Sequence, residues 1–201
     1  MMKYPHYLFL ALIATTAACG PILPKGPDAP RLFALKADIP AAEKTLPVSL
    51  QIQEPTAAAG LDGDRIALKK SPHELDYYAA AKWADTLPAV LRDAVVDAFQ
   101  RAHLATTVGP DTLSFSASHR LAIDIADFQA EYKDGAANPV LHVRLVARLI
   151  EGAGNTVIAT DSIEKSVPAN GNTLQDVVAA ANLAFDQAIG ELSAHIQQRI
   201  K

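Results

Sequence analysis

Apolar and polar residues alternate in several short segments of this chain, which is typical of half-buried strands. The segment 48–53, Val-Ser-Leu-Gln-Ile-Gln, shows the alternation most cleanly. In a later segment the alternation breaks at Asp127-Phe128, which predicts a β-bulge at that point. The segments expected to be extended are 31–35, 48–53, 65–69, 74–78, 119–128, 140–150 and 156–167.

Two other segments repeat their apolar residues at helical spacing. The first helix is expected to begin after Asp85 or Thr86, either of which can cap it, and Pro88 fits its first turn. The second helix opens at 173–176, Thr-Leu-Gln-Asp, a capping box in which Asp replaces the usual Glu or Gln. Strands and helices together predict one α+β domain over 31–201: a mainly antiparallel sheet with two long amphipathic helices packed on one face.

The N-terminal segment has the features of a secretory signal peptide. Lys3 precedes a short apolar run, and small residues lead from it to Cys19, the only cysteine of the chain. The run is shorter than the roughly 20 apolar residues that span a bilayer. The pattern resembles the lipobox of bacterial lipoproteins, in which the cysteine carries a diacylglycerol and an acyl chain and becomes the first residue. The alternative is an ordinary signal peptide with an incidental cysteine.

The lipobox interpretation divides the chain into a signal peptide (1–18), a lipidated cysteine with a Pro-rich tether (19–30) and the domain (31–201). Prolines favour extended geometry of about 3.1 Å per residue, so the tether would hold the domain roughly 30 Å from the membrane. Gly20 follows the cysteine. An Asp there resembles the inner-membrane retention signal of Gram-negative lipoproteins, so Gly20 favours the periplasmic face of the outer membrane.

Charge and motifs argue against several classes of function. The formal net charge is −4, without the basic stripe of a nucleic-acid-binding protein. The sequence has no nucleophile elbow, no phosphate-binding loop and no pair of histidines at helical metal-ligand spacing. Asp124 and Asp127 are near neighbours, but their odd spacing directs them to opposite faces of a strand unless the bulge intervenes. We therefore expect no metal, no other cofactor and no enzymatic activity.

An aromatic segment precedes the first helix and contains Tyr77, Tyr78 and Trp83, the only tryptophan of the chain. One interpretation is that Trp83 fills the core at the start of that helix. The other is a partner-binding surface formed by all three side chains, because Tyr and Trp anchor protein interfaces disproportionately.

The order of these motifs resembles the ABC-type transport auxiliary lipoproteins, the family of the PqiC-like lipoproteins. The resemblance covers essentially all of the chain after the signal peptide. Phe33 stands where a Tyr is usual in the family, and Lys69 or Lys70 and Lys82 stand where Arg is common. Because Lys and Arg are not interchangeable at bidentate sites, a salt bridge that the family makes there is not expected to be the same in this chain. The resemblance rests on Cys19, 31–35, 48–55, Gly60-Leu61, 64–68, 75–78, Trp83-Ala84, Leu87, Leu91, 121–128 and the closing helix.

This resemblance implies a non-enzymatic outer-membrane component of a lipid transport system. Its partners would be a periplasm-spanning MCE-domain protein anchored in the inner membrane, a permease and sometimes an ATPase. The lipoprotein would dock the outer end of that conduit, as a single copy or as a homo-oligomeric ring. Two other functions stay open: a carrier that holds an acyl chain between its helices and its sheet, and an assembly lipoprotein for an outer-membrane barrel.

Overall fold

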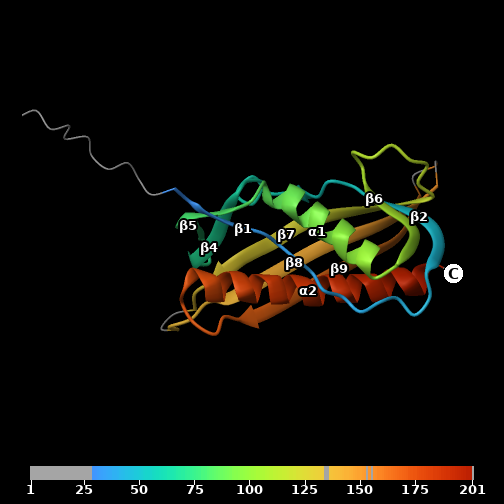
Figure 1. Ribbon diagram of the computed structural model, residues 1–201. Helices are drawn as coiled ribbons and strands as arrows, with labels where there is room; N and C mark the ends of the chain where they lie inside the picture. The colour runs from blue at the N-terminus through green and yellow to red at the C-terminus, as the bar shows by residue number, and fades with distance from the viewer. Residues whose placement is uncertain (1–28, 134–135, 153, 155, 201) are drawn as a thin grey trace, which may run out of the picture.

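The computed structural model describes residues 29–133, 136–152, 154 and 156–200. The expected signal peptide, Cys19 and nearly all of the tether lie outside these residues. The described part contains nine strands and two helices that form one α+β domain, as expected (Figure 1). The strands are β1 (Arg31–Phe33), β2 (Leu46–Ile52), β3 (Thr56–Ala57), β4 (Arg65–Ser71), β5 (Glu74–Trp83), β6 (Ala105–Pro110), β7 (His119–Glu131), β8 (Val140–Glu151) and β9 (Thr156–Pro168), and the helices are α1 (Leu87–Arg101) and α2 (Leu174–Arg199).

The longest strands, β7, β8 and β9, pair antiparallel along nearly their whole lengths. Both helices lie on the same face of the sheet (Figure 1), with α2 against β8 and β9 and α1 against β2 and β6. Leu121, Ile123 and Leu145 point to the covered face and are at most 2% exposed. Alternation in these strands therefore separates a packed face from a solvated one.

Several short strands pair parallel with a neighbour, so the sheet is mixed, although its long ladders and the β4–β5 hairpin are antiparallel. The parallel pairs are β1–β5, β2–β6, β2–β7, β3–β7 and β4–β7. Alternation predicts which side chains are buried, but it does not encode the direction of the neighbouring strand. β3 and β6 are not predicted, because two residues are too few for a pattern and β6 carries adjacent threonines and Gly109-Pro110.

The predicted bulge is confirmed in β7. The pairing register with β8 shifts between Ile125 and Asp127, which leaves Ala126 as the extra residue. Asp124 lies opposite Val146 and Asp127 opposite Arg144, two outward positions of β8. The bulge therefore brings both carboxylates to the solvated face, which simple alternation would not do.

Both helices begin where the capping residues predict. The hydroxyl of Thr86 accepts a hydrogen bond from the Ala89 amide, and Pro88 lies in the first turn of α1. At α2, the Thr173 hydroxyl accepts from the Asp176 amide while the Asp176 carboxylate accepts from the Thr173 amide. The predicted capping box is thus complete, and each such cap stabilises a helix by about 1 kcal/mol.

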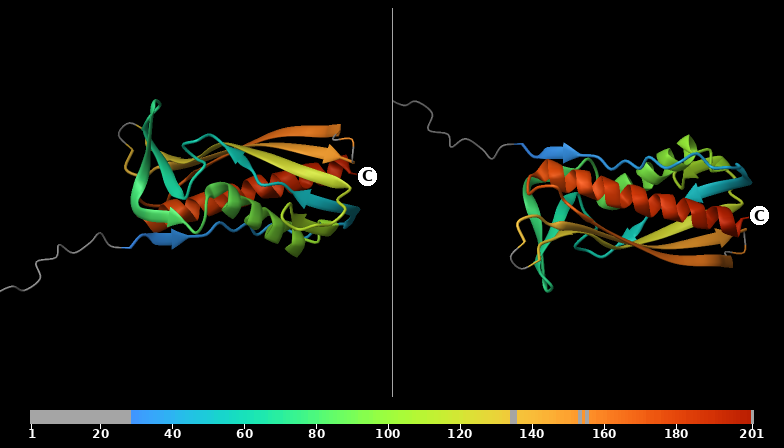
Figure 2. Two further views of the ribbon diagram at one scale, coloured as in Figure 1. Left: turned by 90° about the horizontal axis from the view of Figure 1, so that it is seen from above. Right: turned by 90° about the horizontal axis from the view of Figure 1, so that it is seen from below.

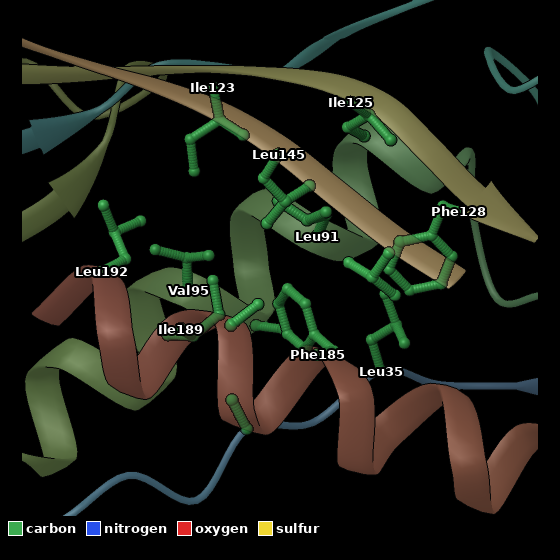
Figure 3. Packing of buried hydrophobic residues seen from close by; sticks show 14 of the residues in the cluster. Leu35, Leu91, Val95, Ile123, Ile125, Phe128, Leu145, Phe185, Ile189 and Leu192 are labelled. Carbon is green, nitrogen blue, oxygen red and sulfur yellow. The ribbon is translucent and has the colours of Figure 1, made fainter. Parts of the chain in front are cut away.

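Aliphatic and aromatic side chains fill the space between the helices and the sheet. Figure 3 shows Phe185 and Ile189 of α2 pointing toward Leu145 of β8, with side chains of α1 beside them. These three residues are fully buried. The same close-up labels Leu35, Leu91, Val95, Ile123, Ile125, Phe128 and Leu192 as members of this core.

Residues 34–45, here called the strap, run over the helices from β1 to β2 (Figure 1). Their backbone is held mainly by side chains of the helices, together with one backbone bond from the Ala42 amide to the Ala102 carbonyl at the end of α1. Asn182 of α2 accepts from the Lys36 amide at 2.7 Å, and Asp186, one turn later, accepts from the Asp38 amide at 2.6 Å. From α1, the Arg101 guanidinium donates to the Ala37 carbonyl. The strap therefore ties the two helices together on their outer side.

Among the described residues, no helix is long and apolar enough to cross a membrane.

Candidate partner-binding surface

The predicted aromatic segment lies in β5, which forms a hairpin with β4 and ends just before α1. Figure 2 shows this hairpin standing across the end of the molecule where α2 begins. The strand bends before it pairs with β1: Arg65 pairs with Lys82 but Ala67 pairs with Tyr77, which leaves extra residues in β5. At the bend Ala80 has a φ of 52°, a left-handed conformation that costs a residue with a side chain about 1–2 kcal/mol.

Tyr77 is half-buried and held at both ends of its side chain. Its hydroxyl donates to the Gly60 carbonyl at 2.9 Å. The guanidinium carbon of Arg65 lies 3.5 Å from the ring centroid, a cation–π contact within the same hairpin. These contacts orient the ring before any partner arrives.

Tyr78 is also half-buried and belongs to a short chain of hydrogen bonds. Its hydroxyl lies 3.0 Å from that of Tyr132, which donates to the Asn172 amide oxygen at 2.6 Å. Since Tyr132 uses its proton for Asn172, Tyr78 donates to Tyr132. Burial, reinforced by this hydrogen bond, raises the pKa of Tyr78 above its ordinary value, so the side chain stays neutral. The pair joins β5 to the segments that follow β7 and precede α2.

Trp83 belongs to the core. Its residue is 2% exposed, and its ring meets Phe128 edge to face at a centroid distance of 5.9 Å. Phe128 in turn contacts Phe185 of α2 at 6.3 Å. This burial agrees with the packing interpretation of Trp83, and a partner-binding surface in the observed conformation is left with Tyr77 and Tyr78.

The two carboxylates on β7 are bound by protein groups. Asp127 accepts from Arg144 Nε at 2.7 Å, and the ammonium of Lys69 lies 3.5 Å away. Burial by itself raises the pKa of Asp127, but hydrogen bonds from Gln129 and Arg144 together with the charges of Arg144 and Lys69 outweigh it and lower the pKa. Asp124 accepts from the Thr56 hydroxyl at 3.0 Å. Both carboxylates therefore make contacts between β7 and a neighbouring strand, Asp127 with β8 and Asp124 with β3.

The described histidines lie on separate elements. His142 on β8 is 3.2 Å from the Ser166 hydroxyl, and His195 on α2 is 3.2 Å from the Asp161 carboxylate. Throughout the part of the chain that the structure describes, no three His, Cys, Asp or Glu side chains come together as metal ligands would.

Residues 33–196 match the family described as the ABC-type transport auxiliary lipoprotein component. The chain belongs to this family. The name of this family describes a lipoprotein component that is auxiliary to ABC-type transport. The match begins at the last residue of β1 and ends in the last turns of α2, so it covers strands β2 to β9, all of α1 and nearly all of α2.

Similar proteins are known from sequence and from crystals. The chain is 31% identical over 156 residues to the uncharacterized protein bll6063 of Bradyrhizobium diazoefficiens, an alignment that covers 77% of this chain and 40% of that one. It therefore spans about two fifths of that relative's length. The crystal structure of protein XCC0632 from Xanthomonas campestris superposes with a TM-score of 0.77 at 26% identity, covering 84% of this chain and 97% of that one. A second crystal structure, of an uncharacterized protein, has a TM-score of 0.66 at 12% identity over 84% and 99% of the two chains and shares the fold.

Two of the lysines that stand where the resemblance suggests arginine make ion pairs. Lys82 Nζ lies 2.7 Å from Asp64 Oδ2, and Lys70 Nζ lies 2.8 Å from Asp76 Oδ2. Both pairs are well exposed, so solvent screens the charges and each pair contributes little to the stability of the fold. A lysine supplies one point of charge where arginine would supply a planar fork.

Proposed function

We propose that this auxiliary lipoprotein is a non-catalytic docking subunit of an ABC-type lipid transport system. In this proposal Cys19 carries the diacylglycerol and acyl chain that anchor it to the periplasmic face of the outer membrane. The β4–β5 hairpin then receives the outer end of a periplasm-spanning MCE-domain protein, whose permease and ATPase lie at the inner membrane. Several copies could surround that end as a homo-oligomeric ring.

The observation that carries the proposal is the pre-ordered aromatic hairpin in a member of this family. Tyr77 and Tyr78 are held by protein contacts, so docking against them would cost little side-chain entropy. Beside them, Ala79 and Ala80 are exposed and small, which lets a partner approach the backbone of the bend. Leu75 and Leu32 add exposed apolar surface on β5 and β1.

The alternative of a lipid carrier receives less support. Such a carrier would hold its acyl chain between the helices and the sheet, and that space is occupied by buried side chains such as Leu91, Val95 and Ile189 (Figure 3). An assembly lipoprotein for an outer-membrane barrel is compatible with the same fold. This function differs from the docking function in the partner that is bound.

Photo-crosslinking in the cells that make the lipoprotein tests the docking proposal. The crosslinker replaces Ala79, which is exposed at the bend, and the matched control replaces Thr160, which is exposed on β9. We expect an MCE-domain protein in the adduct from position 79 and not from position 160. An outer-membrane barrel at position 79 would favour the assembly function, and equal adducts from both positions would contradict docking through the hairpin. A second copy of the chain among the adducts would indicate the ring.

The anchor is tested separately by the intact mass of the protein extracted from membranes. We expect a chain that begins at Cys19 and carries a diacylglycerol and an acyl chain. A Cys19→Ala variant should leave the membrane fraction, and an unmodified polypeptide mass would contradict lipidation.

A further inference from the structure

A crevice opens where β4 and β7 end side by side. The two strands run parallel, with Lys69 opposite Glu131, and the Tyr132 amide donates to the Lys69 carbonyl at 2.9 Å just beyond the last pair. After this point β4 turns into its hairpin while β7 leads toward β8, so the chains diverge. The space between them has a volume of about 440 Å³ and is lined by the two runs 69–72 and 131–133.

The lining is rich in ammonium groups, which is unusual for a chain with a formal net charge of −4. Lys69, Lys70 and Lys133 all line the crevice, with Glu131 as the one carboxylate of the lining. Asp127 and Asp76, outside the lining, pair with Lys69 and Lys70. Lys69 Nζ is 3.5 Å from Asp127 and 3.8 Å from Glu131, both longer than a strong charged hydrogen bond.

The other two lysines are more exposed to solvent than Lys69. Lys70 pairs with Asp76 at 2.8 Å, but both side chains are largely exposed, and exposed pairs exchange readily with a competing anion. Lys133 is exposed, and no described carboxylate lies within ion-pair distance of it. At least two ammonium groups can therefore turn toward one anion in the crevice.

The walls are firm and partly apolar. Tyr132 is fixed by its hydrogen bonds to Asn172 and Tyr78, and Pro72 restricts the backbone at the opposite wall. The Ser71 hydroxyl adds one neutral hydrogen-bond donor. Two or three ammonium groups, a hydroxyl and apolar walls match a phosphate group attached to an organic residue better than they match a carboxylate, because lysines bind phosphate as point charges around its several oxygens.

We propose that this crevice binds a phosphate group, supplied by the headgroup of a phospholipid or by a free phosphate. This binding site goes beyond the proposed docking function. It rests on that proposal in one respect: the lipid anchor would bring a phospholipid headgroup within reach of the crevice. The tyrosine pair connects the crevice to the hairpin, so an occupied crevice would lie directly beside the docking surface.

Isothermal titration calorimetry on the full-length lipoprotein in a neutral detergent tests the proposal. The probes are inorganic phosphate, dihexanoyl-phosphatidylglycerol and dihexanoylglycerol, which has the same acyl chains without the phosphate. We expect phosphatidylglycerol to bind, and Lys133→Gln and Lys70→Gln each to weaken it about tenfold, the effect of losing one charge-assisted hydrogen bond. The control Lys44→Gln removes an exposed lysine elsewhere and should leave the affinity unchanged.

The probes also distinguish the sources of phosphate. Binding of inorganic phosphate, with the same loss in Lys133→Gln, together with no response to the lipid would assign the site to a free phosphate. Failure of both phosphate probes to bind, equal affinities of wild type and Lys133→Gln, or equally tight binding of dihexanoylglycerol would overturn the proposal. None of these results alters the crosslinking pattern expected from position 79, so the two proposals can fail independently.

Discussion

Replacing Trp83 by Ala should destabilise the domain strongly, because the indole is a core side chain in the structure. It is 2% exposed and leads a row of rings through Phe128 to Phe185, which connects β5 to β7 and α2. Truncating a buried Trp to Ala costs about 3–5 kcal/mol, a value that includes the cavity left behind. The edge-to-face contact with Phe128 accounts for about 0.5–1.5 kcal/mol of interaction between the rings.

Guanidinium unfolding of the full-length chain in a neutral detergent measures this loss. Far-UV circular dichroism is the suitable signal, since the variant lacks the only tryptophan. Trp83→Phe should cost less, about 1–3 kcal/mol, because a smaller cavity remains. Leu32→Ala serves as the surface control, because Leu32 is 65% exposed and its truncation should change the stability by about 0.5 kcal/mol or less.

A loss below about 1 kcal/mol in Trp83→Ala would refute the packing argument, because that is the size of an average substitution anywhere in a protein. If the same variant also lost its crosslink from position 79 while remaining folded, Trp83 would act in the interface and the core assignment would be wrong.

Substitutions at three further positions test individual features of the fold. His103→Gly should stabilise the fold by about 0.5–1 kcal/mol in the same unfolding assay, because His103 ends α1 with a φ of 50°, whereas His103→Ala should bring no gain. Asn182→Ala should cost about 1 kcal/mol and speed hydrogen exchange at the Lys36 amide; unchanged exchange there would contradict the side-chain tie of the strap. The pKa of Asp127 is lowered in the folded state, so its contribution is present above the ordinary value of 3.8 and is lost as the pH falls through the lower folded value. Unfolding measured across the acid range should therefore show a shallower decline for Asp127→Asn than for wild type, and parallel curves would contradict the assignment.

Local features of the fold could be predicted from the sequence because they depend on neighbours in the chain. The capping box at Thr173 and the bulge at Asp127 are confirmed where the pattern indicated them. Alternation marked the long strands, since period-two burial is a property of each strand alone. Capping residues placed the start of α1 at Asp85 or Thr86, and Thr86 is the cap.

The candidate sites were predicted only in part. Tyr77 and Tyr78 stood out by composition, but the hydrogen bond of Tyr78 to Tyr132 joins residues far apart in the chain and has no signal in the sequence. Of the lysines in the crevice, Lys69 and Lys70 were noticed only because the resemblance suggests arginine there. Lys133 belongs to no motif in the sequence. Spacing also left the relative orientation of Asp124 and Asp127 open until the bulge was placed.

By itself, then, the sequence determined the period of the long strands and of the two helices and the caps that start the helices, and it predicts a lipobox at Cys19. All of these features depend on a few neighbouring residues. The tertiary structure decided which strands run parallel, how the strap crosses the helices, that Trp83 faces inward, and that β4 and β7 end together to form a crevice. These features arise from contacts between segments that are distant in the chain. Such contacts are selected by the packing of the whole core, and no local pattern of residues specifies them.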